Sequence, residues 1–324
     1  MHATTYRFHS TVTPLIREAI RIAQRVQQQI PLKSHRKPAT FLVGGAVRDL
    51  VVHIPPKDVD IEIYHLSFKQ LDRLLRHIYG KEVKNNNYFG TWEILTPAGL
   101  LNISMPRTEI YRGLHHTDVT ITLDPYLPFS KALARRDFTM NAILVNLLTG
   151  AVHDPYHGSQ DLQTRTLRVV KTKTFRHDAL RAWRAMQFVA RYKLTPDKTL
   201  IQLLRRMAHS PAMALLSRER ILAESNKLCM PHSTPSLGLE LAHTTGLLHS
   251  RVPSLTRLAT QAKTWQKLKN TIDTLVSHTH SPAIFWQTIL KALSETERSA
   301  LIQELMLPKK YRLPKTLYNQ KRTG

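Results

Sequence analysis

The sequence predicts an α+β protein in which a head with a small mixed β-sheet and helices precedes an all-helical neck and body. Two observations carry this prediction. Between about residues 40 and 106, short apolar or alternating runs are interleaved with amphipathic segments, a pattern typical of strands and helices that share one sheet. From about Ser130 onward, apolar residues recur at helical spacing in successive segments separated by Pro or Ser, and we expect helices throughout that part.

The elements of the head follow from local patterns. Strands are expected where apolar residues are continuous or alternate with polar ones, at 40–45, 58–65, 88–95 and 100–106. A short helix is expected at 46–52, and Pro55 and Pro56 prevent it from continuing. A longer helix is expected at 67–80, with Ser67 as its N-cap and Gly80 as its stop. Beyond the head, amphipathic segments predict helices at 177–194, 196–209, 217–230 and 236–248.

We expect five segments along the 324 residues. They are an N-terminal helix (1–38), a head (39–153), a helical neck (154–230), a helical body (231–307) and a basic tail (308–324). The leading helix is inferred from Leu15, Ile16, Ala19, Ile22, Ala23 and Val26, which share one helical face. An arginine-rich transit peptide is the alternative for this segment. The tail has no acidic residue, and we expect it to be mobile and to meet RNA phosphates or nothing.

The charge of the chain is unusual for a globular protein. Lys and Arg number 47 against 23 Asp and Glu, a formal net charge of +24. This surplus predicts a polyanionic partner, with nucleic acid favoured over a membrane. No apolar run approaches the length that spans a bilayer. The single cysteine, Cys229, excludes an internal disulfide and a cysteine-based zinc site, and it fits a reducing compartment, here expected to be the cytoplasm.

Two carboxylates one residue apart indicate a metal site. On a strand, Asp58 and Asp60 point to the same face, and two like charges so close need a cation between them. Hard divalent ions with oxygen ligands suit this arrangement, and Mg²⁺ also brings phosphate oxygens with it. Taken alone, the pair is equally well interpreted as acidic residues on an exposed strand edge.

The preceding glycines favour phosphate chemistry. Gly44 and Gly45 end a strand and open a helix, which lets backbone N–H groups approach phosphates. Arg48 lies one turn into that helix, where a guanidinium can grip a triphosphate. A phosphate cradle shortly before a metal-binding aspartate pair describes a nucleotidyl-transfer site, in which metal ions activate a hydroxyl and stabilise the leaving pyrophosphate.

Seven motifs in order resemble one family. They are "LVGGAVRD", "KDVDIEIY", "MPRTEIYRG", "ARRDFTMNAI", "HDPYHGSQDLQTRTLRVV", "HDALRAWRAMQFVARY" and "LSRERILAE", between about Thr40 and Glu224. This order resembles bacterial-type (class II) tRNA nucleotidyltransferases and their poly(A) polymerase relatives. The resemblance implies a template-independent, Mg²⁺-dependent enzyme that adds C and A to tRNA 3′ ends from CTP and ATP. The helical body would then hold the tRNA acceptor arm.

The resemblance also implies roles for individual residues. Asp58 and Asp60 would be the catalytic metal ligands, and Glu109 would support the metal from a distance or as a third carboxylate. The nucleotide would be bound by residues of three motifs: Gly44, Gly45, Arg48, Arg136, Asp137, Asn141, Asp178, Arg181 and Arg184. For Arg135 and Arg136 together, contact with the RNA backbone is the alternative. In the body, the positive charge would come from Lys227, Arg251, Arg257, Lys263, Lys267 and Lys269.

Base selection is expected from Asp178 and Arg181, which, with Arg184, are spaced along one face of a predicted helix. A carboxylate only accepts hydrogen bonds and a guanidinium only donates them. Cytosine and adenine both offer an amino donor beside a ring-nitrogen acceptor, so this pair would accept CTP and ATP. Guanine and uracil offer the opposite pattern and would be rejected. An intrahelical salt bridge is the alternative for such a pair taken alone.

Some residues differ from the family pattern, so we consider alternative functions. His177 stands where the family has Glu, Gln187 where it often has Arg, and His53 where it has Gly. The alternatives are a poly(A) polymerase or an enzyme limited to CC or A addition, which share the head. A catalytically inactive RNA-binding descendant is the alternative of another class. An antibiotic adenylyltransferase would share Gly-Gly and Asp-x-Asp, but it would need neither the net charge of +24 nor Asp178 and Arg181.

Overall fold

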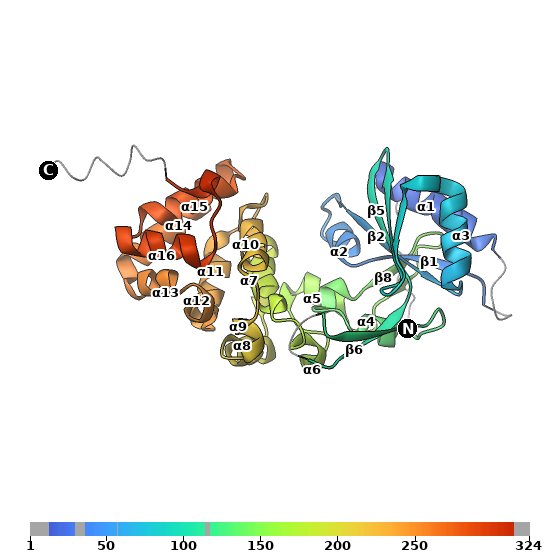
Figure 1. Ribbon diagram of the computed structural model, residues 1–324, viewed down its shortest axis with the longest axis horizontal. Coiled ribbons are helices and arrows are strands. Elements are labelled where there is room, and N and C mark those ends of the chain that lie inside the picture. The colour runs from blue at the N-terminus through green and yellow to red at the C-terminus, as the bar shows by residue number, and fades with distance from the viewer. Residues whose placement is uncertain (1–12, 30–35, 57, 114–116, 314–324) are drawn as a thin grey trace. The chain divides into compact units, whose positions relative to one another are not determined.

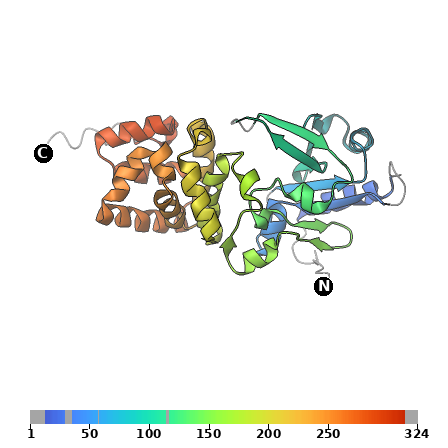
Figure 2. The same cartoon turned by 90° about the horizontal axis from the view of Figure 1, so that it is seen from below.

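The computed structural model describes residues 13–29, 36–56, 58–113 and 117–313, and the chain divides into two compact units. The first unit runs to Thr164 and also takes in Arg168–Phe175. The second unit holds Arg165–Leu167 and the chain from Arg176 onward. The first unit contains a mixed sheet and the second is helical (Figures 1 and 2), which confirms the predicted α+β fold class. The division falls later in the chain than the boundary expected after residue 153.

A seven-stranded mixed sheet forms the frame of the first unit, in the order β3-β4-β5-β2-β1-β8-β9. Neighbouring strands run antiparallel except for β2 and β5, which run parallel. A separate hairpin pairs β6 with β7. The strands are β1 (Ala39–Val43), β2 (Val59–Tyr64), β3 (Val83–Asn86), β4 (Thr91–Thr96), β5 (Gly99–Ser104), β6 (Arg107–Tyr111), β7 (Val119–Leu123), β8 (Leu144–Asn146) and β9 (Val152–His153).

The leading helix is part of this first unit. Helix α1 (Pro14–Gln27) begins at Thr13, whose side chain accepts a hydrogen bond from the Ile16 backbone. All six apolar residues predicted to share its inner face are buried: Leu15, Ile16, Ala19, Ile22, Ala23 and Val26. They pack against β1, β2 and β5, so the expected packing of this helix on the head is confirmed (Figure 1). Residues 1–12 and 30–35 of the predicted segment lie outside the described residues.

The other helices of the first unit are short apart from α3. They are α2 (Gly45–Val51), α3 (Phe68–Tyr79), α4 (Phe129–Leu133), α5 (Gly158–Gln163) and α6 (Thr172–Phe175). The predicted limits of α3 are confirmed, because Ser67 and Gln70 form a reciprocal capping box and Gly80 ends the helix with a positive φ of 58°.

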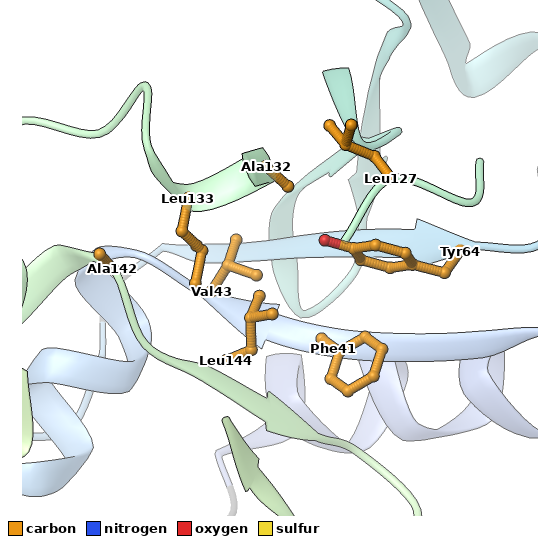
Figure 3. Close-up of a cluster of buried hydrophobic side chains, with 8 residues drawn as sticks. All are labelled: Phe41, Val43, Tyr64, Leu127, Ala132, Leu133, Ala142 and Leu144. Carbon is orange, nitrogen blue, oxygen red and sulfur yellow. The ribbon is translucent and has the colours of Figure 1, made fainter. Parts of the chain in front are cut away.

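A hydrophobic core lies between the sheet and α4. The ring of Phe41 packs edge-on against Tyr64 and Phe129, with ring centres 5.4 and 5.0 Å apart. Figure 3 shows Leu133 of α4 and Leu127 over β1 and β2. This core holds the segment that follows α4 against the same face of β2 that carries Asp60, and that segment supplies the arginines of the site.

Two strands of the first unit, together with a pair of short strands in the second, correct the expectation that the chain is helical from Ser130 onward. In the first unit β8 pairs with β1, and β9 pairs with β8 and forms the edge of the sheet. The run Ala142–Leu148 is apolar almost throughout, so its periodicity does not separate a buried strand from a buried helix. Pairing with β1, some 100 residues earlier in the chain, makes it a strand.

The second unit is built from helices and one pair of two-residue strands (Figures 1 and 2). The strands are β10 (Thr166–Leu167) and β11 (Thr195–Pro196). The helices are α7 (Leu180–Tyr192), α8 (Lys198–Ala208), α9 (Pro211–Ala214), α10 (Arg218–Asn226), α11 (Pro235–Thr244), α12 (Leu247–Arg251), α13 (Pro253–Thr260), α14 (Ala262–His278), α15 (Pro282–Lys291) and α16 (Glu295–Glu304). Helices predicted at 177–194, 196–209, 217–230 and 236–248 therefore correspond to α7, α8, α10 and α11, with α12 beginning at the end of the last range.

Helix α7 is the centre of this unit. It packs closely on α11, where a β-carbon on Gly238 would stand only 2.6 Å from the carbonyl oxygen of Met186. Only glycine allows the two backbones to approach so far. Trp183 and Phe188 of α7 are both buried, as expected of residues that pack away from the predicted functional face.

The described part of the C-terminal segment is ordered on α15. Lys309–Tyr311 form a 3₁₀ turn, Gln287 of α15 donates to the carbonyl of Arg312, and the Arg312 side chain donates to the carbonyl of Leu307. The predicted mobile tail is therefore wrong for these residues, while 314–324 lie outside the described residues. Among the described residues, no helix is long and apolar enough to cross a membrane.

Candidate active site

Asp60 lies at the point where three strands of the sheet meet. It is the register partner of Val43 at the end of β1 and of Asn102 on β5. The Asn102 side-chain amide donates a hydrogen bond of 3.0 Å to Oδ1 of Asp60 and fixes the carboxylate. Asp58 directly precedes β2 and is exposed. Strand alternation therefore sets the orientation of Asp60, while Asp58 stands at the open end of the strand.

The opposite face of β2 is apolar, as the sequence predicts. Val59, Ile61 and Ile63 have no exposed surface. The face that carries Asp60 also carries Glu62, which is fully buried.

The turn after β1 brings a backbone and a cation to Asp60. Gly44 has a φ of 68° and a ψ of −133°, a conformation that residues with a side chain rarely adopt. A β-carbon on Gly44 would stand 2.9 Å from an Arg136 terminal nitrogen and 3.4 Å from Oδ2 of Asp60. Glycine is therefore required at position 44 for two reasons: its backbone conformation disfavours a side chain, and a β-carbon would crowd Arg136 and Asp60. The structure thus brings Gly44, Asp60 and Arg136 close together.

Arg136 has an electrostatic environment suited to an anion. Its Nε atom is buried and has no hydrogen-bond partner among the described residues. Burial and the neighbouring Arg135 lower the pKa of Arg136, while Glu62, Asp60 and Asp137 act in the opposite direction. A buried donor without a partner is costly unless a ligand supplies the acceptor. A phosphate oxygen is such an acceptor.

Three other predicted residues form a network behind Gly45. Arg48 is 6% exposed and donates to Asp49 at 2.8 and 2.9 Å. It also donates at 2.8 Å to Asn141, which in turn donates at 3.0 Å to Asp137. The structure thus brings Arg48, Asp137 and Asn141 together, because Asn141 bonds to both of the others. In this structure the Arg48 guanidinium fastens α2 to the turn at Asn141.

A chain of buried charges links β2 to the β6–β7 hairpin. Glu62 accepts a hydrogen bond of 3.0 Å from Arg135 and one of 2.7 Å from the Tyr64 hydroxyl. Arg135 also lies 3.8 Å from Glu109, which pairs with Arg107 at 3.0 Å. Arg135 is therefore held by carboxylates instead of being available to an RNA backbone. The sequence analysis missed Glu62, although strand alternation from Asp60 was the signal that places it on the site's face.

Glu109 is occupied by other groups. Besides Arg107 and Arg135, the Tyr111 hydroxyl donates to it at 2.9 Å. These positive partners lower the pKa of Glu109, although burial acts in the opposite direction as the largest single influence. Within the described residues, no three His, Cys, Asp or Glu side chains come together as a metal-binding group. The expected third carboxylate is thus not assembled with Asp58 and Asp60.

The two aspartates still fit Mg²⁺. Mg²⁺ is commonly held by one or two carboxylates together with substrate phosphates and water, so a cage of protein ligands is not required. Asp60 is oriented by Asn102 through one oxygen, and its other oxygen, Oδ2, faces the turn at Gly44, which an Arg136 terminal nitrogen also approaches. A carboxylate beside a phosphate-binding cation is the donor set that a magnesium–triphosphate complex needs.

A cavity of about 270 Å³ opens beside Asp60. Its floor is the polar face of β4 and β5, with Thr91, Glu93, Asn102 and Ser104. Its positive wall is formed by Arg107, Arg135 and Arg136. The cavity therefore combines acceptors, donors and cations next to the proposed metal ligand, as a polar phosphorylated substrate requires.

In the second unit, Asp178 is held by a residue that the sequence analysis did not single out. Arg220 at the start of α10 donates to both oxygens of Asp178, at 3.1 and 3.2 Å. Asp178 precedes α7, which begins at Leu180, and accepts a hydrogen bond from the Leu180 backbone. The expectation that Asp178, Arg181 and Arg184 share one helix face is therefore wrong for Asp178, because Asp178 precedes the helix. The motif "LSRERILAE" contained Arg220, but only the fold shows its partner.

Two other residues of α7 have local roles. The Arg184 guanidinium lies over the Phe188 ring at 5.2 Å, and Gln187 is 1% exposed and accepts a hydrogen bond from Arg191. Gln187 is thus a satisfied polar residue of the core.

The cations expected to bind RNA in the body fall into two groups. Lys227, Arg257 and Lys269 pair with Glu224, Glu297 and Glu240, and Arg251 donates to the carbonyls of Ala214 and Leu216. Lys263 and Lys267 are exposed one turn apart on α14. Of the six, these two are the best placed to meet a phosphate backbone.

The sequence of this chain matches a family model over the head and a curated relative over a longer stretch. Residues 40–168 match the model of the poly(A) polymerase head domain. The Multifunctional CCA protein of Xanthomonas campestris pv. campestris is 33% identical over 223 residues, which are 67% of this chain and 52% of that protein. The chain thus spans about half the length of the curated relatives it matches.

Solved structures extend the likeness over nearly the whole chain. The CCA-adding enzyme of Bacillus stearothermophilus, in complex with CTP, gives a TM-score of 0.69 at 26% identity, covering 93% of this chain and 68% of that one. The CCA-adding enzyme of Thermotoga maritima, complexed with tRNA-CCA, gives a TM-score of 0.70 at 18% identity, covering 93% and 69%. The second likeness, at its low identity, shows the fold alone.

Proposed function

The chain belongs to the family of bacterial-type tRNA nucleotidyltransferases and poly(A) polymerases, and from this premise we propose that it adds C and A to the 3′ end of tRNA. CTP and ATP are the proposed nucleotide substrates. The RNA 3′ hydroxyl attacks the α-phosphorus of the nucleotide, a new P–O bond forms, and pyrophosphate leaves. The observation that carries the proposal is the close approach of Gly44 to Asp60 and Arg136, two residues that line the cavity.

Asp58 and Asp60 are the proposed metal-binding and catalytic residues. Mg²⁺ bound to them would activate the attacking hydroxyl and neutralise charge on the triphosphate. Asn102 keeps the Asp60 carboxylate in one orientation, which lowers the entropy lost on binding. Asp58 is exposed and adds the second carboxylate from the open end of β2.

Arg136 is the proposed phosphate ligand. Its Nε donor is buried and unused, and the absence of a side chain at Gly44 leaves room for an oxygen beside one of its terminal nitrogens. Gly45 and Arg48, with Asp137 and Asn141, are proposed to complete the nucleotide-binding pocket. Their mutual hydrogen bonds preorganise this side of the site, and a preorganised polar site stabilises charge without rearranging.

Asp178, Arg181 and Arg184 are proposed to select the base in the second unit. Asp178 accepts the amino hydrogen of cytosine or adenine, and Arg181 donates to the ring nitrogen. Arg220 supports this role because it fixes the Asp178 carboxylate by two hydrogen bonds. A base with the opposite hydrogen-bond pattern would leave these groups unpaired, which costs binding free energy.

The acceptor end of tRNA is the proposed RNA partner. The net charge of +24 favours a polyanion, and Lys263 and Lys267 offer exposed cations on α14. A-form RNA is recognised largely by its shape and backbone, so contacts of this kind need no base readout. A chain with one cysteine forms no internal disulfide, which fits a reducing compartment, and we propose a cytoplasmic location.

The test is incorporation of labelled CMP and AMP into a tRNA transcript that lacks CCA. We expect incorporation with Mg²⁺ and none with a chelator, and we expect CTP to be used before ATP. Binding of the transcript without any incorporation would contradict the proposal and favour an inactive RNA-binding protein. Long A-tails would instead identify a poly(A) polymerase, which the match of residues 40–168 to that head domain keeps as the second candidate.

A further inference from the structure

Glu62 and Asp60 share one face of β2, but only Glu62 is closed off from solvent. Glu62 has no exposed surface, and both of its oxygens are engaged, one by Tyr64 and one by Arg135. Asp60 is partly exposed, lines the cavity and receives a side-chain hydrogen bond from Asn102. Two carboxylates on the same strand face are thus used in opposite ways.

We propose that Glu62 is a positioning residue that holds Arg135 away from Asp60, so that the Asp60 carboxylate stays open to a divalent cation. This inference rests on the proposed use of Asp60 as a metal ligand. Without it, the buried pair of Glu62 and Arg135 would be no more than a structural contact.

The geometry shows why Arg135 needs to be held. Arg135 and Asp60 line the same cavity, and residues two apart on a strand are separated by roughly 7 Å along its direction. That separation is within the reach of a flexible arginine side chain. A guanidinium on Asp60 would form a strong charge-assisted hydrogen bond with the oxygens that a metal needs. The ion pair with Glu62, at 3.0 Å, removes this competitor.

Glu109 cannot replace Glu62 in this task. It lies 3.8 Å from Arg135, and it already accepts hydrogen bonds from Arg107 at 3.0 Å and Tyr111 at 2.9 Å. The Arg135 side chain is 16% exposed, so solvent offers it little compensation. Two carboxylates, Asp60 and Glu93, line the cavity with Arg135 and Arg136, and of these Asp60 lies on the same strand as Glu62, two residues away. Asp60 is therefore the partner that we expect Arg135 to take once the charge on Glu62 is lost.

The same pair also separates the roles of the two arginines. Arg135 is paired with Glu62, whereas a terminal nitrogen of its neighbour Arg136 lies beside Gly44 and Asp60. Adjacent arginines thus serve different partners, one a fixed carboxylate of the protein and the other an incoming anion.

The test is Mn²⁺ binding to the full chain, measured by electron paramagnetic resonance without nucleotide or RNA. Glu62→Gln preserves the shape and removes the charge, and we expect it to weaken Mn²⁺ binding about tenfold, as the loss of a residue that orients a metal ligand does. Tyr64→Phe is the matched control, because it removes the other hydrogen bond to Glu62 and leaves Arg135 paired. Tyr64→Phe should bind Mn²⁺ with the affinity of the wild type. Asp60→Ala, which removes the proposed ligand, gives the signal expected when Mn²⁺ binding is lost.

The double variant Glu62→Gln/Arg135→Met separates positioning from structure. Replacing both members of a buried ion pair is often tolerated, so this variant should fold even if Glu62→Gln alone does not, and thermal unfolding checks each protein. Because the competing cation is gone, Mn²⁺ affinity should return to the wild-type value. Affinity that stays low in the double variant, or wild-type affinity in Glu62→Gln, would overturn the inference. Restored Mn²⁺ binding in a chain that never incorporates nucleotide would instead refute the proposed function.

Discussion

A β-carbon on Gly44 would stand 2.9 Å from a terminal nitrogen of Arg136, although the two residues are far apart in the sequence. The same position is 3.4 Å from Oδ2 of Asp60. The turn after β1 is therefore the place where backbone, cation and carboxylate come closest. Its glycine can be tested with a control that the chain itself provides.

Gly44→Ala should lose activity out of proportion to its loss of stability. Gly44 has φ 68° and ψ −133°, and Gly80 has nearly the same conformation, φ 58° and ψ −125°. Alanine at either position should cost about 2 kcal/mol of backbone strain. A β-carbon on Gly80 meets nothing within 4 Å, whereas one on Gly44 displaces Arg136. Chemical denaturation should show a similar loss of stability in Gly44→Ala and Gly80→Ala. Nucleotide incorporation should be lost in Gly44→Ala alone. Equal activity of the two variants would contradict the assignment.

The two adjacent arginines should respond differently to removal. Arg135→Ala leaves Glu62 buried without its cation, and we expect a loss of about 3 kcal/mol in the free energy of unfolding. Arg136→Ala removes a buried donor that has no partner on its Nε atom, so stability should change little while KM for the nucleotide rises. Denaturant titration and steady-state kinetics of both variants check this. A stability loss confined to Arg136→Ala would show that the roles are reversed.

Removal of both aspartates should abolish turnover and spare RNA binding. Asp58 is exposed and Asp60 is partly exposed, so Asp58→Ala with Asp60→Ala disturbs no buried packing. Their loss removes the proposed ligands of the metal, while the cations of the second unit remain. Filter binding with labelled tRNA should give an affinity within about threefold of the wild type, somewhat tighter where two negative charges are lost. Retained nucleotide incorporation would refute the metal assignment.

Nucleotide choice should depend on Asp178, Arg181 and Arg220. Exchanging Asp178 and Arg181 for groups of the opposite hydrogen-bond polarity should admit UTP or GTP. Arg220→Ala should weaken selectivity more than it changes kcat with CTP, because it frees the Asp178 carboxylate that Arg220 holds by two hydrogen bonds. Competition assays with all four nucleotides measure this. An unchanged preference in the exchanged variant would exclude the proposed base reading.

Much of the fold was predictable because it depends on neighbours in the chain. The inner face of α1 and the limits of α3 follow from helical periodicity and capping residues, and the structure has both where the sequence predicts them. β8 was not predictable in this way, because an apolar run becomes a strand only by pairing with β1. The described residues 308–313 likewise owe their order to contacts with α15 and with Leu307.

The candidate site likewise contains residues that the sequence identifies and residues whose roles depend on contacts between distant parts of the chain. Gly44 and Asp60 were singled out because their motifs carry chemistry by residue type and spacing, and Arg136 because its motif resembles the family pattern. Glu62 is buried only because Arg135, 73 residues later in the chain, supplies its counter-charge. Asp178 precedes the helix whose face it was expected to share, and its carboxylate pairs with Arg220. Each of these partners comes from the three-dimensional fold, and periodicity does not report it.

The central claim is that this chain completes tRNA 3′ ends, and one measurement tests it most directly. A single tRNA is prepared lacking CCA, ending in C and ending in CC, and each form is incubated with Mg²⁺ and a single labelled nucleotide beside an unrelated RNA. The account predicts CMP addition to the first two forms, AMP addition to the third, and growth that stops at CCA only on tRNA. No incorporation into a tRNA that the chain demonstrably binds, or A-tails on any RNA, would contradict it.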